Sequence, residues 1–459
     1  MTSRAPREPD EPALPTTRRR DDRERLLAET LAYAVESIPF YGRLGPPPPT
    51  SLEDFPLVDA LLLAEREEEF VRFDRFPDAI LFTGGTTRTP SVVYRSGREY
   101  ETWIRHATGL APGDTVPPED LVDGFAINLW TPAHGMPLLP AYGFPVANVP
   151  LDYPPHAWYV LRLIERGLPV AGQRLPATRL LSSYQQLLML TDFLWSNGLD
   201  LRDCSLELVE SSSFHMPPSV AARLADFWGA EVATAFGLTE FEQAPMEPCP
   251  SCGGYHVPDT VYSELLAPDR SARVTRGAGV LVLTSLLPFV SLQPRIRYWT
   301  NDLFELLPPC ERVGEPGLRF RGRADRCVIV REDGAFRAVL TPLEIVDCLA
   351  DLPHVRRDDG WYRGFLRGGT PRADSPFRPG WILFGLERQP GAVAVTVEAD
   401  FDPAADASLA RDLRDRFLAA LRRRSPRLDA DLEAHELELR VELVEPGGLA
   451  ARGTPLART

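Results

Sequence analysis

Short apolar runs suited to β-strands alternate with helical stretches through the first half of this chain. The strand-like runs are residues 79–82, 124–130, 146–149, 206–209 and 231–235, and the clearest helical stretches are residues 183–197 and 219–228. Such alternation is typical of a mostly parallel sheet layered with helices. Residues 279–285 and 295–307 have the pattern of further β structure.

The length of 459 residues exceeds what one core usually organises, so more than one domain is expected. After residue 323 the pattern changes to short strands and helices, including a charged amphipathic helix at 409–424. We therefore predict an α/β protein with a large layered N-terminal α/β domain, residues 26–322, and a small mobile α+β C-terminal domain, residues 323–459. Residues 1–25 are polar and rich in Arg, Asp and Pro, and they are expected to form a disordered leader.

Composition argues against several classes of partner. The net charge of −15 disfavours nucleic-acid binding, which requires a basic face. No apolar run approaches the roughly 20 residues of a membrane-spanning helix, and no signal peptide is apparent. Six cysteines in a chain of this length favour a reducing, cytoplasmic location over a disulfide scaffold.

All 50 basic residues of the chain are arginine, and lysine is absent. This absence excludes a Schiff base to pyridoxal phosphate, a phosphate-binding lysine and a lysine general base. Arginine keeps its charge and binds phosphates, but it does not shuttle protons. A GC-rich genome, which favours arginine codons, accounts for most of the loss.

Four short motifs carry residue types suited to a nucleotide. The first is a glycine- and threonine-rich turn whose backbone N–H groups and hydroxyls could hold phosphate oxygens, although an ordinary polar turn has the same composition. In the second, an aromatic side chain could stack on a purine and a carboxylate could bind Mg²⁺. The third offers an aspartate for ribose hydroxyls, and the fourth lies at the proposed domain boundary. The motifs contain, in order, Thr83, Gly84, Gly85, Thr86 and Thr87; Phe236, Gly237, Thr239 and Glu240; Asp302; and Arg323 and Asp325.

The order and spacing of these motifs resemble those of the adenylate-forming (acyl-CoA synthetase) superfamily, and within it the phenylacetate-CoA ligase group. Residues 29–44 and 52–57 are similar to the N-terminal helix of that group and the segment after it, and residues 339–349 to the start of its C-terminal domain. The resemblance therefore covers nearly the whole chain. It implies a two-step reaction. A carboxylate attacks the α-phosphate of MgATP to give an acyl-adenylate, and a thiol or amine then displaces AMP after the C-terminal domain rotates.

The resemblance also implies a role for each motif residue. Thr83, Gly84, Gly85, Thr86 and Thr87 would hold phosphates, and Phe236 and Gly237 would line the adenine site. The Thr239 hydroxyl of the same motif could bind phosphate. Glu240 would bind Mg²⁺, Asp302 with Arg323 nearby would bind ribose, and Asp325 would be the hinge. Residues 26–322 would thus bind nucleotide and acyl group, with residues 323–459 as a lid.

The chain departs from the family most seriously near its C-terminus. A catalytic lysine should follow a glycine there, but Gly453 is followed by Thr454, and Arg452 and Arg458 are the nearby cations. Three explanations stay open: adenylation assisted by an arginine, use of a preformed adenylate or other activated acyl group, or loss of catalysis. We assign Arg452, Thr454 and Glu240 as the catalytic candidates.

A second departure concerns the acyl pocket. The segment that precedes the adenine turn, which ends in Phe214 and His215, replaces a family motif. Together with Trp130 and His134, these two residues are candidates to contact substrate. Ordinary core packing is at least as good an explanation for the aromatic residues.

Cys249, Cys252 and His256 form a further cluster, and Cys310 lies farther along the chain. Two thiols separated by two residues suit one half of a tetrahedral zinc site. The resemblance adds that some members of the phenylacetate-CoA ligase group have cysteines in both regions and bind a structural zinc ion there. A closed set of three cysteines and one histidine would be structural, whereas reduced cysteines on a loop are the alternative.

The sequence therefore predicts ATP- and Mg²⁺-dependent activation of a small carboxylic acid, aromatic in the leading interpretation. The acceptor would be CoA, a carrier-protein thiol or an amine, and the cofactors would be ATP/AMP, Mg²⁺ and a structural zinc ion. An amide- or N–N-bond-forming ligase of secondary metabolism fits the same residues, and a degenerate nucleotide-binding protein is the rival. A homodimer is compatible with this interpretation.

Overall fold

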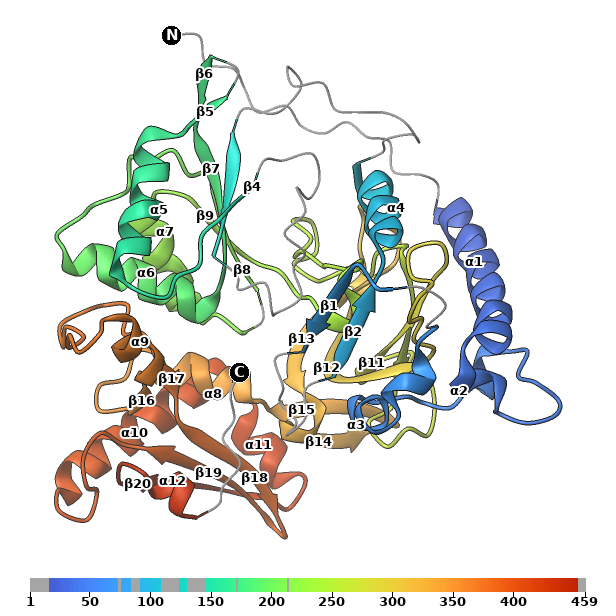
Figure 1. Ribbon diagram of the computed structural model, residues 1–459. Coiled ribbons are helices and arrows are strands. Elements are labelled where there is room, and N and C mark those ends of the chain that lie inside the picture. The colour runs from blue at the N-terminus through green and yellow to red at the C-terminus, as the bar shows by residue number, and fades with distance from the viewer. Residues whose placement is uncertain are drawn as a thin grey trace.

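A five-stranded parallel sheet forms the first lobe of the protein (Figure 1). The computed structural model describes residues 16–72, 76–83, 91–108, 124–129, 146–170, 172–212 and 214–452. The strands run in the order β4-β3-β7-β8-β9, with every neighbouring pair parallel. They are β3 (Phe125–Asn128), β4 (Val146–Asn148), β7 (Ala177–Ser183), β8 (Leu208–Ser212) and β9 (Glu231–Thr234); the helices are α5 (Pro154–Arg166), α6 (Tyr184–Ser196) and α7 (Pro218–Trp228), and a hairpin joins β5 (Leu168–Val170) to β6 (Gln173–Leu175). The predicted α/β fold class is confirmed.

Helix α6 is the most deeply buried helix of this lobe. The side chain of Ser183 caps it by accepting a hydrogen bond from the Gln186 N–H at 3.3 Å. Every residue from Tyr184 to Leu194 is buried. A helix that is buried all round must be covered on every side. The parallel sheet provides only part of that cover.

An antiparallel sheet of order β10-β11-β12-β13 forms the second lobe. Its strands are β10 (Val261–Leu266), β11 (Ala278–Ser285), β12 (Tyr298–Pro309) and β13 (Pro316–Arg323); around it lie α1 (Thr16–Ser37), α2 (Pro39–Gly42), η1 (Leu52–Asp54), α3 (Ala60–Glu65), η2 (Glu67–Phe70), the hairpin of β1 (Ala79–Phe82) and β2 (Val92–Arg95), α4 (Gly97–Thr108) and η5 (Thr239–Phe241). A second hydrophobic core, which includes the stacked rings of Phe40 and Phe70, joins the N-terminal helices to this sheet. Helix α1 already begins at Thr16, within the range 1–25 that was predicted as a leader.

The C-terminal part begins after η6 (Ala324–Arg326) and is built on the sheet β18-β19-β20. Its elements are β14 (Val328–Glu332), β15 (Ala335–Leu340), α8 (Pro342–Leu349), β16 (Arg357–Asp358), α9 (Gly360–Phe365), β17 (Trp381–Ile382), β18 (Phe384–Gln389), β19 (Ala392–Glu398), α10 (Ala407–Arg424), α11 (Leu428–Glu433), β20 (Glu438–Val444) and α12 (Gly448–Ala451). The charged helix α10 buries Leu413, Phe417 and Leu421, which recur at helical spacing on one face. No helix in the described part of the chain is long and apolar enough to cross a membrane.

The C-terminal part packs directly on α6, and one hydrophobic cluster runs through both (Figure 1). The rings of Phe193 and Phe365 meet edge to face at 5.6 Å across this contact. The buried carboxylate of Asp192 accepts hydrogen bonds from the hydroxyls of Tyr362 and Ser375. The side of α6 that the parallel sheet leaves open is therefore covered by α9 and the segment after it.

We expect Asp192→Ala to lower the free energy of unfolding by on the order of 2–4 kcal/mol, because two buried hydroxyls lose their acceptor. Asp192→Asn keeps an acceptor oxygen and should lose less. Urea denaturation of the two variants and the wild-type protein measures the difference. Asp374→Asn, in an exposed ion pair with Arg372, is the surface control. An unchanged urea midpoint in Asp192→Ala would show that this contact adds nothing to stability.

Candidate functional site

A cavity of about 210 Å³ lies at the carboxyl ends of β8 and β9, where all three parts of the protein meet. Open α/β sheets bind ligands at this edge. Helix α8 of the C-terminal part closes one side of the cavity. The lining residues are Phe214, His215, Met216, Thr234, Ala235, Phe236, Gly237, Leu238, Tyr255, Asp302, Phe320, Gly322, Arg323, Arg326, Pro342 and Leu343.

Aromatic rings form one wall of this cavity. Phe236 follows β9 directly, and its ring centroid lies 5.3 Å from that of Phe320 and 6.2 Å from that of Tyr255. Next to it, Gly237 has open space where a side chain would project. A planar ligand could therefore lie against the rings and approach the backbone closely.

A buried carboxylate faces the cavity from the antiparallel sheet. Asp302 on β12 and Arg323 on β13 are cross-strand neighbours, and the Arg323 Nη1 lies 3.3 Å from the Asp302 Oδ1. The Asp302 Oδ2 is buried, and no described residue donates a hydrogen bond to it. Burial raises the pKa of Asp302 to about 6, against the opposing effect of Arg323. This oxygen can accept a hydrogen bond from a ligand hydroxyl.

Glu240, the predicted magnesium ligand, lies beneath the cavity and does not line it. Its Oε1 accepts a hydrogen bond from the Tyr298 hydroxyl at 2.7 Å. Its backbone oxygen accepts from Arg95 and Arg295 at 2.9 and 3.0 Å. Thr239 begins the same short 3-10 helix. In this conformation the Glu240 carboxylate is held by the protein itself.

Glu242, two residues farther on, is a buried acid that the sequence analysis did not single out. Its Oε2 accepts from the Tyr100 hydroxyl at 2.9 Å and lies 3.8 Å from the Arg95 Nε, while its Oε1 has no partner in the described structure. Burial raises the pKa of Glu242 to about 7, and Arg95 only partly offsets this effect. Beneath the cavity, the buried Glu242 carboxylate is thus only partly paired, because Tyr100 and Arg95 contact one of its oxygens and leave the other without a partner in the described structure.

Phe214 and His215, both predicted to contact substrate, line the cavity and also touch the C-terminal part. The Phe214 ring lies 4.3 Å from that of Trp381. The His215 Nε2 lies 2.7 Å from the Asp347 Oδ1. These contacts place the junction between the first lobe and the C-terminal part directly beside the cavity.

The remaining predicted residues fall into two groups. Trp130, His134, Gly84, Gly85, Thr86, Thr87 and Thr454 lie outside the described residues. Thr83 directly follows β1, and its hydroxyl accepts from the Ser91 N–H; Asp325 lies in η6 beside the cavity-lining Arg326. Arg452 is exposed at the end of α12, pairs with Glu442 at 2.7 Å and is not among the cavity-lining residues.

Several cavity residues were missed by the sequence analysis, among them Tyr255, Phe320 and Arg326. Tyr255 lies between Cys252 and His256, in a segment whose sequence indicated only a metal site. Phe320 is one of the apolar residues of strand β13, and Arg326 is the residue directly after the predicted hinge Asp325. The sequence does not mark either residue itself as part of a binding site. Only the fold brings these residues to one place.

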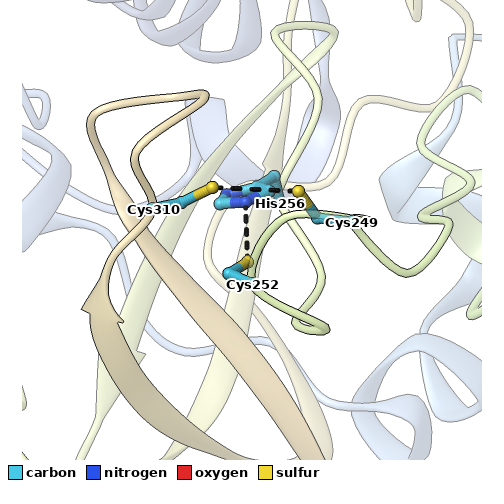
Figure 2. Close-up of side chains that lie close together, drawn as sticks. All are labelled: Cys249, Cys252, His256 and Cys310. Atoms are coloured by element: carbon cyan, nitrogen blue, oxygen red, sulfur yellow. Dashed lines mark hydrogen bonds between the residues drawn. The ribbon is translucent and has the colours of Figure 1, made fainter.

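The four predicted metal ligands come together beside the cavity (Figure 2). The ligand atoms of Cys249, Cys252, His256 and Cys310 all lie within 4.8 Å of one another. The Cys249 and Cys310 sulfurs are 3.8 Å apart, and the Cys252 Sγ lies 3.3 Å from the His256 Nε2. A tetrahedral zinc ion with bonds of about 2.0–2.3 Å requires separations of roughly 3.5–3.8 Å, so the cluster fits such an ion.

Two turns with the same hydrogen-bond pattern present these ligands. The Cys249 N–H donates to the Gly254 oxygen, and the Cys310 N–H donates to the Glu315 oxygen. Gly253 and Gly314 occupy corresponding places with φ values of 66° and 77°, a region that favours glycine. Burial raises the pKa of Cys310, but backbone N–H groups of the second turn, together with His256 and Cys249, outweigh it and lower the pKa to about 6. This turn therefore favours the thiolate that a metal requires.

Comparison with known proteins gives the same fold. No model of a known protein family matches the sequence, and no curated protein sequence matches it. In structure, the chain is similar to 2-hydroxyisobutyryl-CoA ligase in its postadenylation state with R3-HIB-AMP, with a TM-score of 0.61 and 18% identity over 97% of this chain and 88% of that one. The protein has the fold of an adenylate-forming acyl-CoA ligase.

Two other states of the same ligase were also matched at 18% identity over 97% of this chain. The open conformation with 2-HIB-AMP and CoA gives a TM-score of 0.61 over 90% of that chain. The thioesterification state gives 0.55 over 89%. The resemblance read from the sequence is thus confirmed at the level of the fold.

We expect the free energy of unfolding to fall as the pH rises from about 5 to 8, in part because of Glu242. Its raised pKa means that the folded protein binds this proton more tightly than the unfolded chain, so stability is lost as the proton leaves. Glu242→Gln should reduce the fall by on the order of 1–3 kcal/mol. Urea denaturation at several pH values tests this, with the exposed Glu101→Gln as control. An identical pH dependence in Glu242→Gln and wild type would contradict the assignment.

Proposed function

We propose that the protein uses MgATP to activate a carboxylic acid as an acyl-adenylate and transfers the acyl group to a thiol or amine. The observation that carries this proposal is the cavity, in which an aromatic wall and a buried carboxylate with a free oxygen meet at the carboxyl ends of parallel strands. The fold supports it, because solved structures of 2-hydroxyisobutyryl-CoA ligase hold an acyl-AMP.

The residues of the cavity suit a nucleotide. Adenine would lie against Phe236, with Tyr255 and Phe320 in the same wall. The Asp302 Oδ2 would accept a hydrogen bond from a ribose hydroxyl, and Arg323 would keep that carboxylate ionised. ATP would supply the adenylyl group and the pyrophosphate that leaves. Mg²⁺ would bind near Glu240 once its carboxylate exchanged Tyr298 for the ion, with Thr83, Gly84, Gly85, Thr86 and Thr87 on the phosphates.

The acid would occupy the side of the cavity formed by Phe214, His215 and Met216. An aromatic acid suits such a wall, with Trp130 and His134 as further candidates to contact it. The acceptor would be CoA, a carrier-protein thiol or an amine. An amide- or N–N-bond-forming ligase differs only in that acceptor.

The absence of lysine affects only the first step, in which the carboxylate attacks the α-phosphate to form the acyl-adenylate. A cation must neutralise charge between the carboxylate and the α-phosphate. Arg452 is paired with Glu442 outside the cavity, so it could serve only after the C-terminal part rotates about Asp325. Arg323 and Arg326 already line the cavity. Use of a preformed adenylate, or loss of turnover, are the alternatives.

We further propose that Cys249, Cys252, His256 and Cys310 hold a structural zinc ion. All four positions of a tetrahedron would be filled by protein, which leaves none for a reacting water. The ion would tie the loop that contains Tyr255 to the hairpin of β12 and β13. It would therefore stabilise the aromatic wall rather than take part in the reaction.

We expect the wild-type protein to catalyse ATP–pyrophosphate exchange with at least one acid in a panel of aryl and alkyl acids. Asp302→Asn should weaken ATP binding about 10- to 100-fold, because it removes a charged acceptor from a ribose hydroxyl. Arg452→Ala should lower exchange if this arginine replaces the lysine. Calorimetric titration with ATP and with AMP measures the loss of binding in Asp302→Asn, and isotope exchange measures the effect of Arg452→Ala.

The exposed Asp412→Asn, which breaks an ion pair on α10, is the matched control and should behave as wild type. Exchange that persists in Arg452→Ala would assign the cation to the cavity arginines. Intact AMP binding without exchange for any acid would refute adenylation and leave acyl transfer or a catalytically inactive protein.

We expect one zinc ion per chain in the purified protein, and its loss in Cys310→Ser because one of four ligands is missing. Cys204→Ser is the matched control, since the Cys204 thiol donates to the Trp228 oxygen, as a hydroxyl can. Elemental analysis by mass spectrometry measures the metal, and thermal unfolding should show a lower Tm for Cys310→Ser only. Equal zinc content in the two variants would rule out this site.

A further inference from the structure

His215 occupies a special position, because it lines the cavity and bonds to a different domain. It follows β8 in the first lobe, whereas its partner Asp347 belongs to α8 of the C-terminal part. The Nε2 of His215 lies 2.7 Å from the Asp347 Oδ1. The second ring nitrogen, Nδ1, has no partner among the residues that the structure describes. The imidazole therefore has one nitrogen fixed by a carboxylate and one available.

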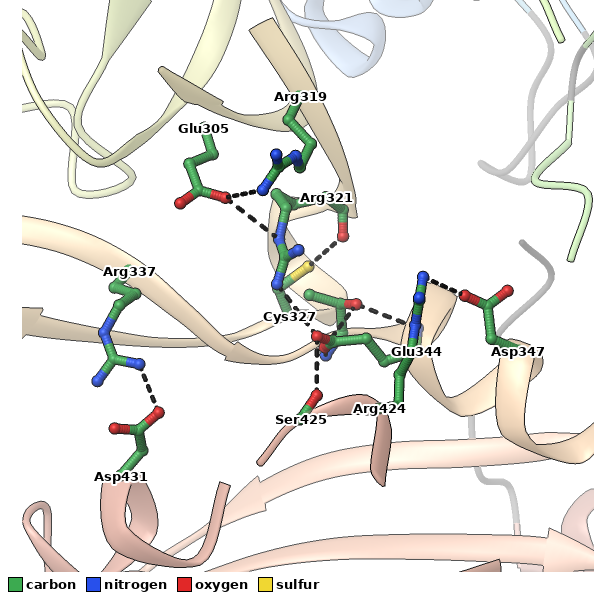
Figure 3. A network of polar contacts seen from close by, with 11 residues as sticks. Glu305, Arg319, Arg321, Cys327, Arg337, Glu344, Asp347, Arg424, Ser425 and Asp431 are labelled. Carbon is green, nitrogen blue, oxygen red and sulfur yellow. Dashed lines mark hydrogen bonds and ion pairs between the residues drawn. The ribbon is translucent and has the colours of Figure 1, made fainter. Parts of the chain in front are cut away.

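Asp347 is firmly held in this geometry. Its side chain is only 7% exposed, and its Oδ2 accepts from the Arg424 Nη2 at 2.9 Å (Figure 3). Helix α8 itself is fixed by Glu344. That carboxylate completes the capping box with Thr341 and also accepts from Arg321 of β13 and Ser425 at 3.2 and 3.1 Å (Figure 3).

This arrangement determines which ring nitrogen can act as a base. A carboxylate on one nitrogen makes that nitrogen the donor, so the other nitrogen of a neutral imidazole carries the lone pair. The same carboxylate stabilises the imidazolium that forms when a proton is taken up. Nδ1 of His215 is thus suited to accept a proton.

We propose that His215 is the general base for the acyl acceptor and that Asp347 is its positioning residue. This proposal rests on the proposed function. As the sulfur or nitrogen of the acceptor bonds to the acyl carbon, one proton of the acceptor passes to the His215 Nδ1; an amine that arrives as the ammonium ion gives its second proton to solvent. The bond between the acyl carbon and the phosphate oxygen breaks, AMP leaves with the electron pair, and the imidazolium later gives its proton to solvent.

The chemistry of the two half-reactions shows why the base belongs to the second. A carboxylic acid with a pKa of about 4 is already ionised at neutral pH and needs no base. A thiol of pKa about 8.5, or an alkylamine of pKa about 10, is mostly protonated and must lose a proton to attack. The cavity-lining arginines cannot remove it, because they stay protonated.

The His215–Asp347 contact could instead serve only to join the domains. The structure offers a matched control for that role. Arg223 of α7 pairs with Asp351, just beyond α8, at 2.7 Å. This pair also joins the first lobe to the C-terminal part, but neither residue lines the cavity. Arg223→Gln breaks a domain contact of equal length without touching the proposed base.

The test compares acceptors in single-turnover reactions of preformed benzoyl-AMP. CoA and ethylamine need a base, whereas hydroxylamine is largely unprotonated at neutral pH. We expect His215→Gln to lower transfer to whichever of CoA or ethylamine the wild type uses by about 100-fold or more, the usual contribution of a general base. Transfer to hydroxylamine should fall less than about 5-fold. Asp347→Asn should show the same selectivity, and Arg223→Gln should match wild type.

Other outcomes overturn the proposal in distinguishable ways. Equal losses with all acceptors in His215→Gln would assign the residue a structural role. A loss of equal size in Arg223→Gln would assign the effect to domain docking. Wild-type pyrophosphate exchange without transfer to CoA or ethylamine would refute the base but not adenylation. Neither exchange nor transfer by the wild type would refute the proposed function itself.

Discussion

The burial of helix α6 on all sides is the constraint on which the rest of the structure depends. The parallel sheet covers one side of this helix, and the C-terminal part covers another through Phe365, Tyr362 and Ser375. One hydrophobic cluster therefore runs through both domains. In this conformation that contact positions the C-terminal part so that α8 closes the cavity with Pro342 and Leu343 and brings Asp347 to His215.

The buried carboxylates of Asp302 and Glu242 lower the stability of the protein but favour ligand binding. Desolvation raises the pKa of both Asp302 and Glu242, and each has a carboxylate oxygen without a partner in the described structure. Unpaired buried oxygens are costly in an isolated protein. A ligand hydroxyl at Asp302 would recover part of that cost, which an exposed acid would not.

Much of the fold and part of the site could be predicted from the sequence. The alternating pattern anticipated β3, β4, β8, β9, α6 and α7, and the motifs anticipated that Phe236, Asp302 and Arg323 would meet. Local patterns missed Tyr255, which reaches the cavity through its backbone pairing with Leu318, and Arg326, which follows β13 in η6. They also could not foresee that Glu240 is bonded to Tyr298, a residue far along the chain.

The sequence by itself determined the class of fold and the absence of lysine, because periodicity and composition are local properties of the chain. It also supplied all four cysteine and histidine residues of the candidate metal centre. Only the tertiary structure decided that Arg452 lies outside the cavity while Arg323 and Arg326 line it. It alone joined His215 to Asp347, since packing around α6 brings together residues that no sequence pattern relates.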